Sequence, residues 1–268
     1  MKRLDAEDFV VSADSVQSTA WSTDQPTLTQ FYTSSVQAGG TSGNYYLSIY
    51  QVDATGSNSA VQFDIAYGNS VGSGSEYYND AFPNLTPAST TYGQYRTMIL
   101  EDENAEFIFG DGTNLITGSD FWVLSVERSR YKEKLYPQTF NLQLSGSGGL
   151  IHLTNDSNDT KTSTFLGATR AYQVISGSDG SAYDSSGYVA GSGSYGLFLP
   201  EIGTVLLNTA AVSQSIQVDA DRSANKTNGF NQAVLYNSIL LGESFQLNAE
   251  ETITSDYVFV RARNSEFN

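Results

Sequence analysis

The chain has 268 residues, with 13 lysines and arginines against 29 aspartates and glutamates, which gives a formal net charge of −16. This charge repels nucleic-acid phosphates and anionic lipids at long range, so we expect neither nucleic acid nor a membrane as a partner. The absence of Cys and the presence of a single His exclude disulfides, thiolate chemistry and nearly all zinc, copper and haem sites, so we expect no cofactor.

The length allows one large or two ordinary domains, and an aromatic content of 12% is too high for a disordered tract. The first eight residues turn acidic where a signal peptide needs its apolar segment. No apolar run approaches the roughly 18 residues that span a bilayer. We therefore expect a soluble product of the cytosol.

Residues 1–27 carry few periodic apolar positions and end near Pro26. This pattern predicts an extended N-terminal arm that becomes ordered against a neighbour.

Short stretches of alternating or β-branched and aromatic residues follow, and Gly/Ser/Asn clusters separate them. Alternation predicts half-buried strands at Val61–Tyr67, Thr139–Leu144 and Tyr172–Ile175. The mixed stretches Tyr45–Val52 and Phe121–Val126 are typical of strands covered on both faces.

Two segments have helical spacing instead. Thr86-Pro87 is suited to be the N-cap and first residue of a short helix over about 87–100, whose Tyr92, Tyr95 and Ile99 fall on one face. The apolar positions of 230–241 predict a second helix, with Gly242 at the C′ position, or failing that a buried strand-like run.

These elements predict a mainly β fold of antiparallel, sandwich-like domains with one or two short helices. Tyr136-Pro137 is the best candidate boundary, which divides the chain into the arm, a β-rich domain at 28–136 and a second at 137–268. The last predicted strand, Asp256–Arg263, is followed by only five residues, so it is either a sheet edge or part of a chain that continues.

Structural roles explain the residues that could form a catalytic or metal site more simply than such sites do. His152 alternates with apolar neighbours on a strand and lacks a motif that would orient it as a base. Three loops, 110–114, 155–159 and 219–228, are rich in oxygen ligands but do not match the calcium-loop spacing, and Asn and Asp in turns explain them. We predict no metal site and no catalytic residue.

Carboxylates are numerous, and a glycosidase needs only two of them at a suitable separation. The densest run, Glu101–Glu106, is more typical of a solvated, self-repelling loop than of an active site.

Four of the 13 basic residues alternate in the segment that follows Phe121–Val126. If that strand continues, period two places all four on one face. The resulting basic stripe either docks an acidic neighbouring subunit or pairs internally with Glu101–Glu106 in a charged edge strand. The stripe consists of Arg128, Arg130, Lys132 and Lys134.

Several short sequence segments together resemble those of large virion structural proteins of contractile-tailed bacteriophages (myoviruses) that infect cyanobacteria and other marine bacteria. They are Gln30–Val36, Gly43–Tyr46, Phe63–Asn69, Gly72–Ser75, Tyr92–Arg96, Val126–Leu135, Phe140–Leu142, Leu144–Gly148, Gly193–Pro200 and Phe259–Asn268. The resemblance spans most of the chain and contains no active site. It implies viral assembly in the host cytoplasm and a place in the tail or baseplate region of the virion.

We therefore expect a structural component that binds other virion proteins through protein–protein contacts in symmetric, multi-copy assembly, and that is not an enzyme. One alternative is a carbohydrate-binding or adhesin module of a phage fibre, because tyrosines and polar loops can stack on and hydrogen-bond sugars. A second alternative is a polysaccharide-degrading enzyme that uses two carboxylates.

Overall fold

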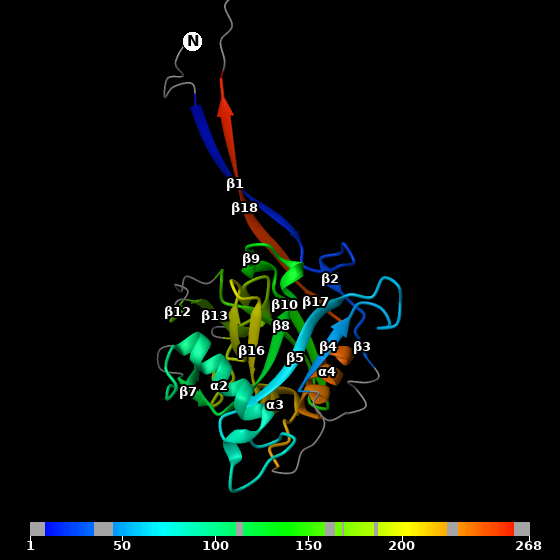
Figure 1. The fold of residues 1–268 in the computed structure, drawn as a ribbon, viewed down its shortest axis with the longest axis vertical. Helices are drawn as coiled ribbons and strands as arrows, with labels where there is room; N and C mark the ends of the chain where they lie inside the picture. Colours follow the sequence, from blue (N-terminus) through cyan, green and yellow to red (C-terminus); the bar gives the residue numbers. More distant parts are fainter. Residues whose placement is uncertain are drawn as a thin grey trace, which may run out of the picture.

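The fold is mainly β and is built around one large, curled antiparallel sheet (Figure 1), as the sequence predicts. The computed structural model describes residues 9–34, 45–110, 115–158, 164–167, 169–184, 187–223 and 230–259.

The large sheet has thirteen strands in these residues, eleven of which follow the order β2-β17-β10-β11-β13-β15-β16-β8-β5-β4-β3. Two short strands, β12 and β14, pair with β13 beside this path. The bounds are β2 Thr27–Leu28, β3 Tyr32–Thr33, β4 Tyr46–Tyr50, β5 Val61–Asn69, β8 Asp120–Val126, β10 Asn141–Gly146, β11 Gly149–Asn155, β12 Thr164–Leu166, β13 Thr169–Ser178, β14 Ser181–Ala182, β15 Gly196–Leu199, β16 Thr204–Asn208 and β17 Phe245–Gln246.

The sheet curls until its two ends lie close together. β2 and β3 stand at opposite ends of the strand order, yet only three residues of chain separate them. Two smaller sheets also lie in the part of the chain that the structure describes. One has the order β1-β18-β9, with β1 Phe9–Thr19, β18 Asn248–Val258 and β9 Lys134–Leu135, and the other pairs β6 Phe107–Phe109 with β7 Ile116–Gly118.

Both faces of the central strands are buried. On one face, Trp122 and Leu124 of β8 join the larger hydrophobic core, while Phe121 and Val123 face a second, smaller core. The two-sided burial predicted for Phe121–Val126 is therefore confirmed. All residues of β15 and β16 are buried as well.

In the described residues, three α-helices cover the sheet: α2 Pro87–Leu100, α3 Thr209–Ile216 and α4 Phe230–Gly242. Short 3-10 turns lie at Pro83–Leu85 (η2), Arg128–Arg130 (η3) and Pro137–Thr139 (η4). No helix within the described ranges is both long and apolar enough to cross a membrane.

Helix α2 forms as predicted. The Thr86 side chain accepts a hydrogen bond from the Ser89 N–H at 3.2 Å, and Pro87 occupies the first turn. Tyr92 and Ile99 are buried in the smaller core and Tyr95 packs against it. The helix ends at Glu101, whose φ of 55° is left-handed.

Helix α4 also forms as predicted, but the role expected for Gly242 is wrong. Gly242 is the last helical residue, and Glu243, with a φ of 60°, adopts the left-handed conformation instead. Gly242 is needed for close packing, because a Cβ atom there would lie 2.1 Å from the carbonyl oxygen of Gln143 on β10.

The expectation of one or two helices omitted α3. Asn208 caps this helix by accepting a hydrogen bond from the Ala210 N–H at 3.1 Å. Its eight residues are too few for a clear helical period. Burial of Ala211, Val212 and Ile216 in the larger core stabilises it instead.

The predicted boundary at Tyr136-Pro137 does not coincide with a break in the sheet. β8, which precedes it, pairs with β16, which follows it, over five residues. The larger core likewise contains residues from Ala20 to Ala249.

Candidate protein-interaction surface

A two-stranded antiparallel ribbon of β1 and β18 projects from the body of the molecule (Figure 1). The pairing runs from Phe9 opposite Val258 to Thr19 opposite Asn248, eleven residues that extend about 37 Å. Residues 9–19 of the predicted arm are thus extended, and they pair with a strand of the same chain.

The outer end of this β1/β18 ribbon is apolar and solvent-exposed. Val10 lies opposite Tyr257 on one face, and Phe9 lies opposite Val258 on the other. We call the six outer side chains, each 46–60% exposed, the apolar tip. The apolar tip consists of Phe9, Val10, Val11, Tyr257, Val258 and Phe259.

The edges of the ribbon are open. Among the described residues β1 pairs only with β18, and β18 pairs with β9 only at Ala249 and Glu250. β1 carries one charged residue, Asp14, and neither lysine nor proline. A long edge with as little charge as that of β1 can recruit a further strand.

Ion pairs hold the base of the ribbon to the body. Lys134 Nζ lies 3.1 Å from Glu250 Oε2, and Lys132 Nζ lies 2.9 Å from Glu251 Oε2. The Ser15 hydroxyl donates to Glu250 Oε1 at 2.5 Å. These contacts tie β1, β18 and the segment before β9 together.

The strand expected to carry the basic stripe does not continue. β8 ends at Val126, and Arg128–Arg130 forms the turn η3. Lys132 and Lys134 pair with successive β18 residues, whose side chains point to opposite faces of the strand. The stripe is therefore not one flat face, and its internal partners are Glu250 and Glu251 instead of Glu101–Glu106.

The two arginines of the stripe have local roles. Arg128 donates to the carbonyl oxygens of Tyr131 and Lys132, and its guanidinium lies 4.5 Å from the Tyr131 ring centroid. Arg130 donates to the Ser129 hydroxyl at 3.3 Å. The docking role of the stripe stays a prediction.

Charge pairing affects the acidity of Glu250. Partial burial raises its pKa, but the hydrogen bonds from Ser15 and Lys134 and the charge of Lys134 outweigh burial, and its pKa lies below the ordinary value. The Glu250 carboxylate therefore stays ionised to a lower pH than an ordinary glutamate does.

The acidic run Glu101–Glu106 forms an exposed loop between α2 and β6, as predicted. His152 lies on β11 opposite Gln143, with its ring centroid 6.2 Å from that of Tyr183.

The oxygen-rich loops use their side chains in turns where the structure describes them. Asn155 accepts from Ser157 N–H at 3.0 Å, and Asp221 accepts from Ser223 N–H at 2.8 Å. Residues 111–114, 159 and 224–228 of these predicted loops lie outside the described residues.

The sequence did not predict the β1/β18 ribbon. Its β1 strand has apolar residues at 9, 10, 11, 13 and 16, which together follow neither a helical nor a strictly alternating period. The available signal was the low charge and the β-branched residues of Phe9–Thr19, together with the predicted strand at Asp256–Arg263. β18 is described up to Val258, and residues 260–263 lie outside the described residues.

No protein-family model, curated protein or solved structure matches this chain.

Proposed function

We propose that this chain is a structural component of a contractile-tailed phage virion, in the tail or baseplate region, that assembles by docking its β1/β18 ribbon on neighbouring virion proteins. The observation that carries the assembly role is the exposed apolar tip on a ribbon with open edges. The place in the virion rests on the sequence resemblance.

The energetics of the ribbon support an assembly role. A two-stranded ribbon is marginally stable by itself in water, and each fully buried apolar side chain of the tip would contribute roughly 1.5–3 kcal/mol on docking. A neighbouring protein that covers the tip would bury its apolar side chains. A strand that this protein adds to an open edge would stabilise the ribbon. Multi-copy symmetry would then supply avidity.

The test is co-purification of the full chain with the structural proteins encoded beside it, followed by mass photometry. We expect ring-like or wedge-like complexes. The double substitution Val10→Lys with Val11→Lys should weaken the association at least about tenfold, because a cation then stands on each face of the tip.

The matched control is Val71→Lys with Leu241→Lys, which adds the same charge at exposed apolar positions of the body. This control should assemble like the unsubstituted chain. A chain that stays monomeric beside its partners, or a tip variant that assembles normally, would refute the proposal.

In this role the chain catalyses no reaction. Loss of viscosity in a polysaccharide solution incubated with the chain, abolished by one Asp or Glu replacement, would contradict that part of the proposal.

A further inference from the structure

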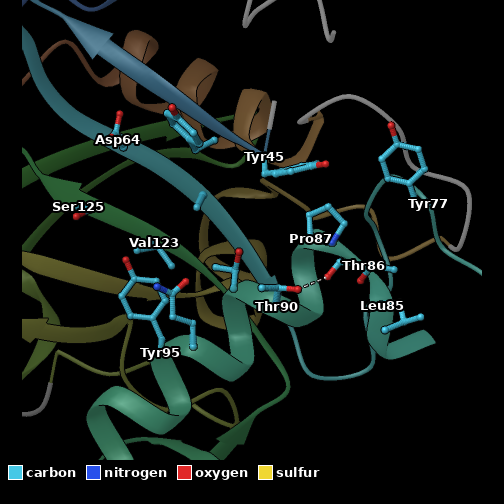
Figure 2. Close-up of a pocket in the computed structure, with 14 residues that line it drawn as sticks. Tyr45, Asp64, Tyr77, Leu85, Thr86, Pro87, Thr90, Tyr95, Val123 and Ser125 are labelled. Carbon is cyan, nitrogen blue, oxygen red and sulfur yellow. Dashed lines mark hydrogen bonds between the residues drawn. The ribbon is translucent and has the colours of Figure 1, made fainter. Parts of the chain in front are cut away.

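A pocket of about 500 Å³ lies between α2 and the strands β4, β5 and β8 (Figure 2). These elements belong to the body of the molecule, from which the ribbon projects (Figure 1). Its volume falls within the range of small-molecule sites. Four tyrosines and a half-buried carboxylate line it together with hydroxyl and amide side chains. The tyrosines, the carboxylate and the amide are Tyr45, Tyr46, Tyr77, Tyr95, Asp64 and Gln94.

The sheet places a polar row at the floor of this pocket. Asp64 of β5 lies directly opposite Ser48 of β4 on one side and Ser125 of β8 on the other. Residues opposite one another in antiparallel strands share a face, so these side chains stand side by side. The next row on the same face, Tyr46, Ala66 and Val123, is apolar.

Asp64 is the unusual member of the row. Its Oδ1 atom is buried and has no hydrogen-bond partner among the described residues. Burial raises the pKa of Asp64; hydrogen bonding with Ser48 opposes this shift, and the Glu127 charge adds to it. A buried acceptor without a partner lowers stability, so its presence beside a cavity points to a ligand that donates to it.

The tyrosines are spread along the pocket. Figure 2 shows Tyr77 and Tyr45 toward one end, and Tyr95 with Asp64 toward the other. Tyr77 has a left-handed φ of 62°, a strained conformation for a bulky residue, and it is 58% exposed. Such extended aromatic surface suits an elongated ligand with apolar faces better than a compact cation enclosed by several rings.

Polar groups of α2 complete the lining. Gln94, Thr90 and Thr91 lie along the helix wall, and Ser125 lies at the floor near Tyr95. Hydroxyl, amide and carboxylate groups between aromatic rings match a saccharide, whose hydroxyls donate and accept while its C–H faces pack on rings. The chain's net charge of −16 and Asp64 itself disfavour an anionic sugar.

We propose that this pocket binds a neutral oligosaccharide of two or three sugar units, with Asp64 accepting hydrogen bonds from its hydroxyls and Tyr46 and Tyr77 packing on its rings. This activity is additional to assembly through the ribbon.

The test is isothermal titration of the full chain with maltotriose, cellotriose, mannotriose and lactose, beside trigalacturonate and tetramethylammonium. We expect at least one neutral sugar to bind with a dissociation constant of about 1 mM or tighter. Asp64→Asn and Tyr77→Ala should each weaken that binding about tenfold or more. Both variants should keep the assembly behaviour of the unsubstituted chain.

One matched control is Asp102→Asn, which makes the same chemical change in an exposed loop. The other is Tyr183→Ala, which removes a similarly exposed tyrosine that directly follows β14, the strand paired with β13. These controls should bind like the unsubstituted chain. Four results would overturn the proposal: no neutral sugar binding, binding that both pocket variants retain, binding of trigalacturonate alone, or binding of tetramethylammonium alone.

Discussion

At the scale of single residues, the buried Asp120 and the half-buried Asp64 differ in how many hydrogen bonds their carboxylates accept. Asp120, whose side chain is 5% exposed, accepts from Arg222 Nε at 2.9 Å and from the Tyr67 hydroxyl at 3.1 Å. Arg222 also donates to Thr209 Oγ1 at 3.0 Å. Asp64 has one oxygen without a partner among the described residues. Asp120 therefore has a structural role, and Asp64 is available to a ligand.

The Asp120 network predicts a loss of stability in Asp120→Ala. The substitution removes the acceptor of the buried Tyr67 hydroxyl and of Arg222 Nε, while the Arg222 guanidinium keeps its bond to Thr209 Oγ1. Because the Arg222 side chain is 43% exposed and water can solvate it, we expect a fall of about 2 kcal/mol in the free energy of unfolding, less than for a fully buried pair. Urea denaturation at neutral pH measures this quantity.

The control for this prediction is Asp102→Ala in the exposed loop after α2, which should change the free energy of unfolding by less than about 0.5 kcal/mol. Equal denaturation midpoints for the two variants would show that the Asp120 network does not stabilise the fold.

At the scale of elements, the described part of the β1/β18 ribbon contacts the body of the molecule at its base, through β9 and the segment before it. Outward from Glu251, β18 has β1 as its strand partner in the described residues, and nearly every residue there is exposed. Elements with few buried contacts open at low cost in free energy. The ion pairs of Lys132 and Lys134 join β18 to the segment before β9 at this base, and the Lys134 pair is the less exposed of the two.

The lowered pKa of Glu250 predicts acid loosening of the ribbon base. A carboxyl group with a lower pKa in the folded state stabilises that state above its unfolded pKa, and this stabilisation is lost as the pH falls through the folded value. Methyl NMR of Val10, Val11 and Val16 between about pH 6 and pH 2 should show a transition below the ordinary Glu pKa.

Glu250→Gln is the matched variant for that titration, since it keeps the shape and removes the ionisation. Its ribbon methyl signals should lack the Glu250 transition and resemble the low-pH state throughout. An identical titration in both proteins would assign the transition to another group.

At the scale of the whole molecule, an aromatic cluster closes the curled sheet. Phe245 of β17 lies 4.9 Å from Trp21, 5.4 Å from Phe63 of β5 and 5.9 Å from Phe140, measured between ring centroids. The Trp21 indole N–H also donates to the Phe245 carbonyl oxygen at 3.0 Å. β17 and β5 stand toward opposite ends of the strand order, so this cluster joins the two ends.

Phe245→Ala should therefore destabilise the entire fold. Removing a fully buried phenyl ring that several other rings contact should lower the free energy of unfolding by about 3–5 kcal/mol. Differential scanning calorimetry should show one transition at a lower temperature. Phe82→Ala, at a position 61% exposed, is the control and should leave the transition nearly unchanged. A separate early transition in Phe245→Ala would indicate two independent units.

Local patterns in the sequence determined the elements whose stability depends on near neighbours. Alternation identified β5, two-sided apolar character identified β8, and helical spacing identified α2 and α4, with the N-cap Thr86 as a further signal for α2. The mainly β class followed from these, because burial periodicity and caps act within a few residues.

Only the tertiary structure decided which distant segments meet. The pairing of β1 with β18, the continuity of the sheet across Tyr136-Pro137 and the alignment of Ser48, Asp64 and Ser125 all depend on strand register between remote parts of the chain. Register is set by the whole core and by the path of the chain, and no local pattern contains it. The ribbon and the pocket, on which both proposals rest, arise from that register.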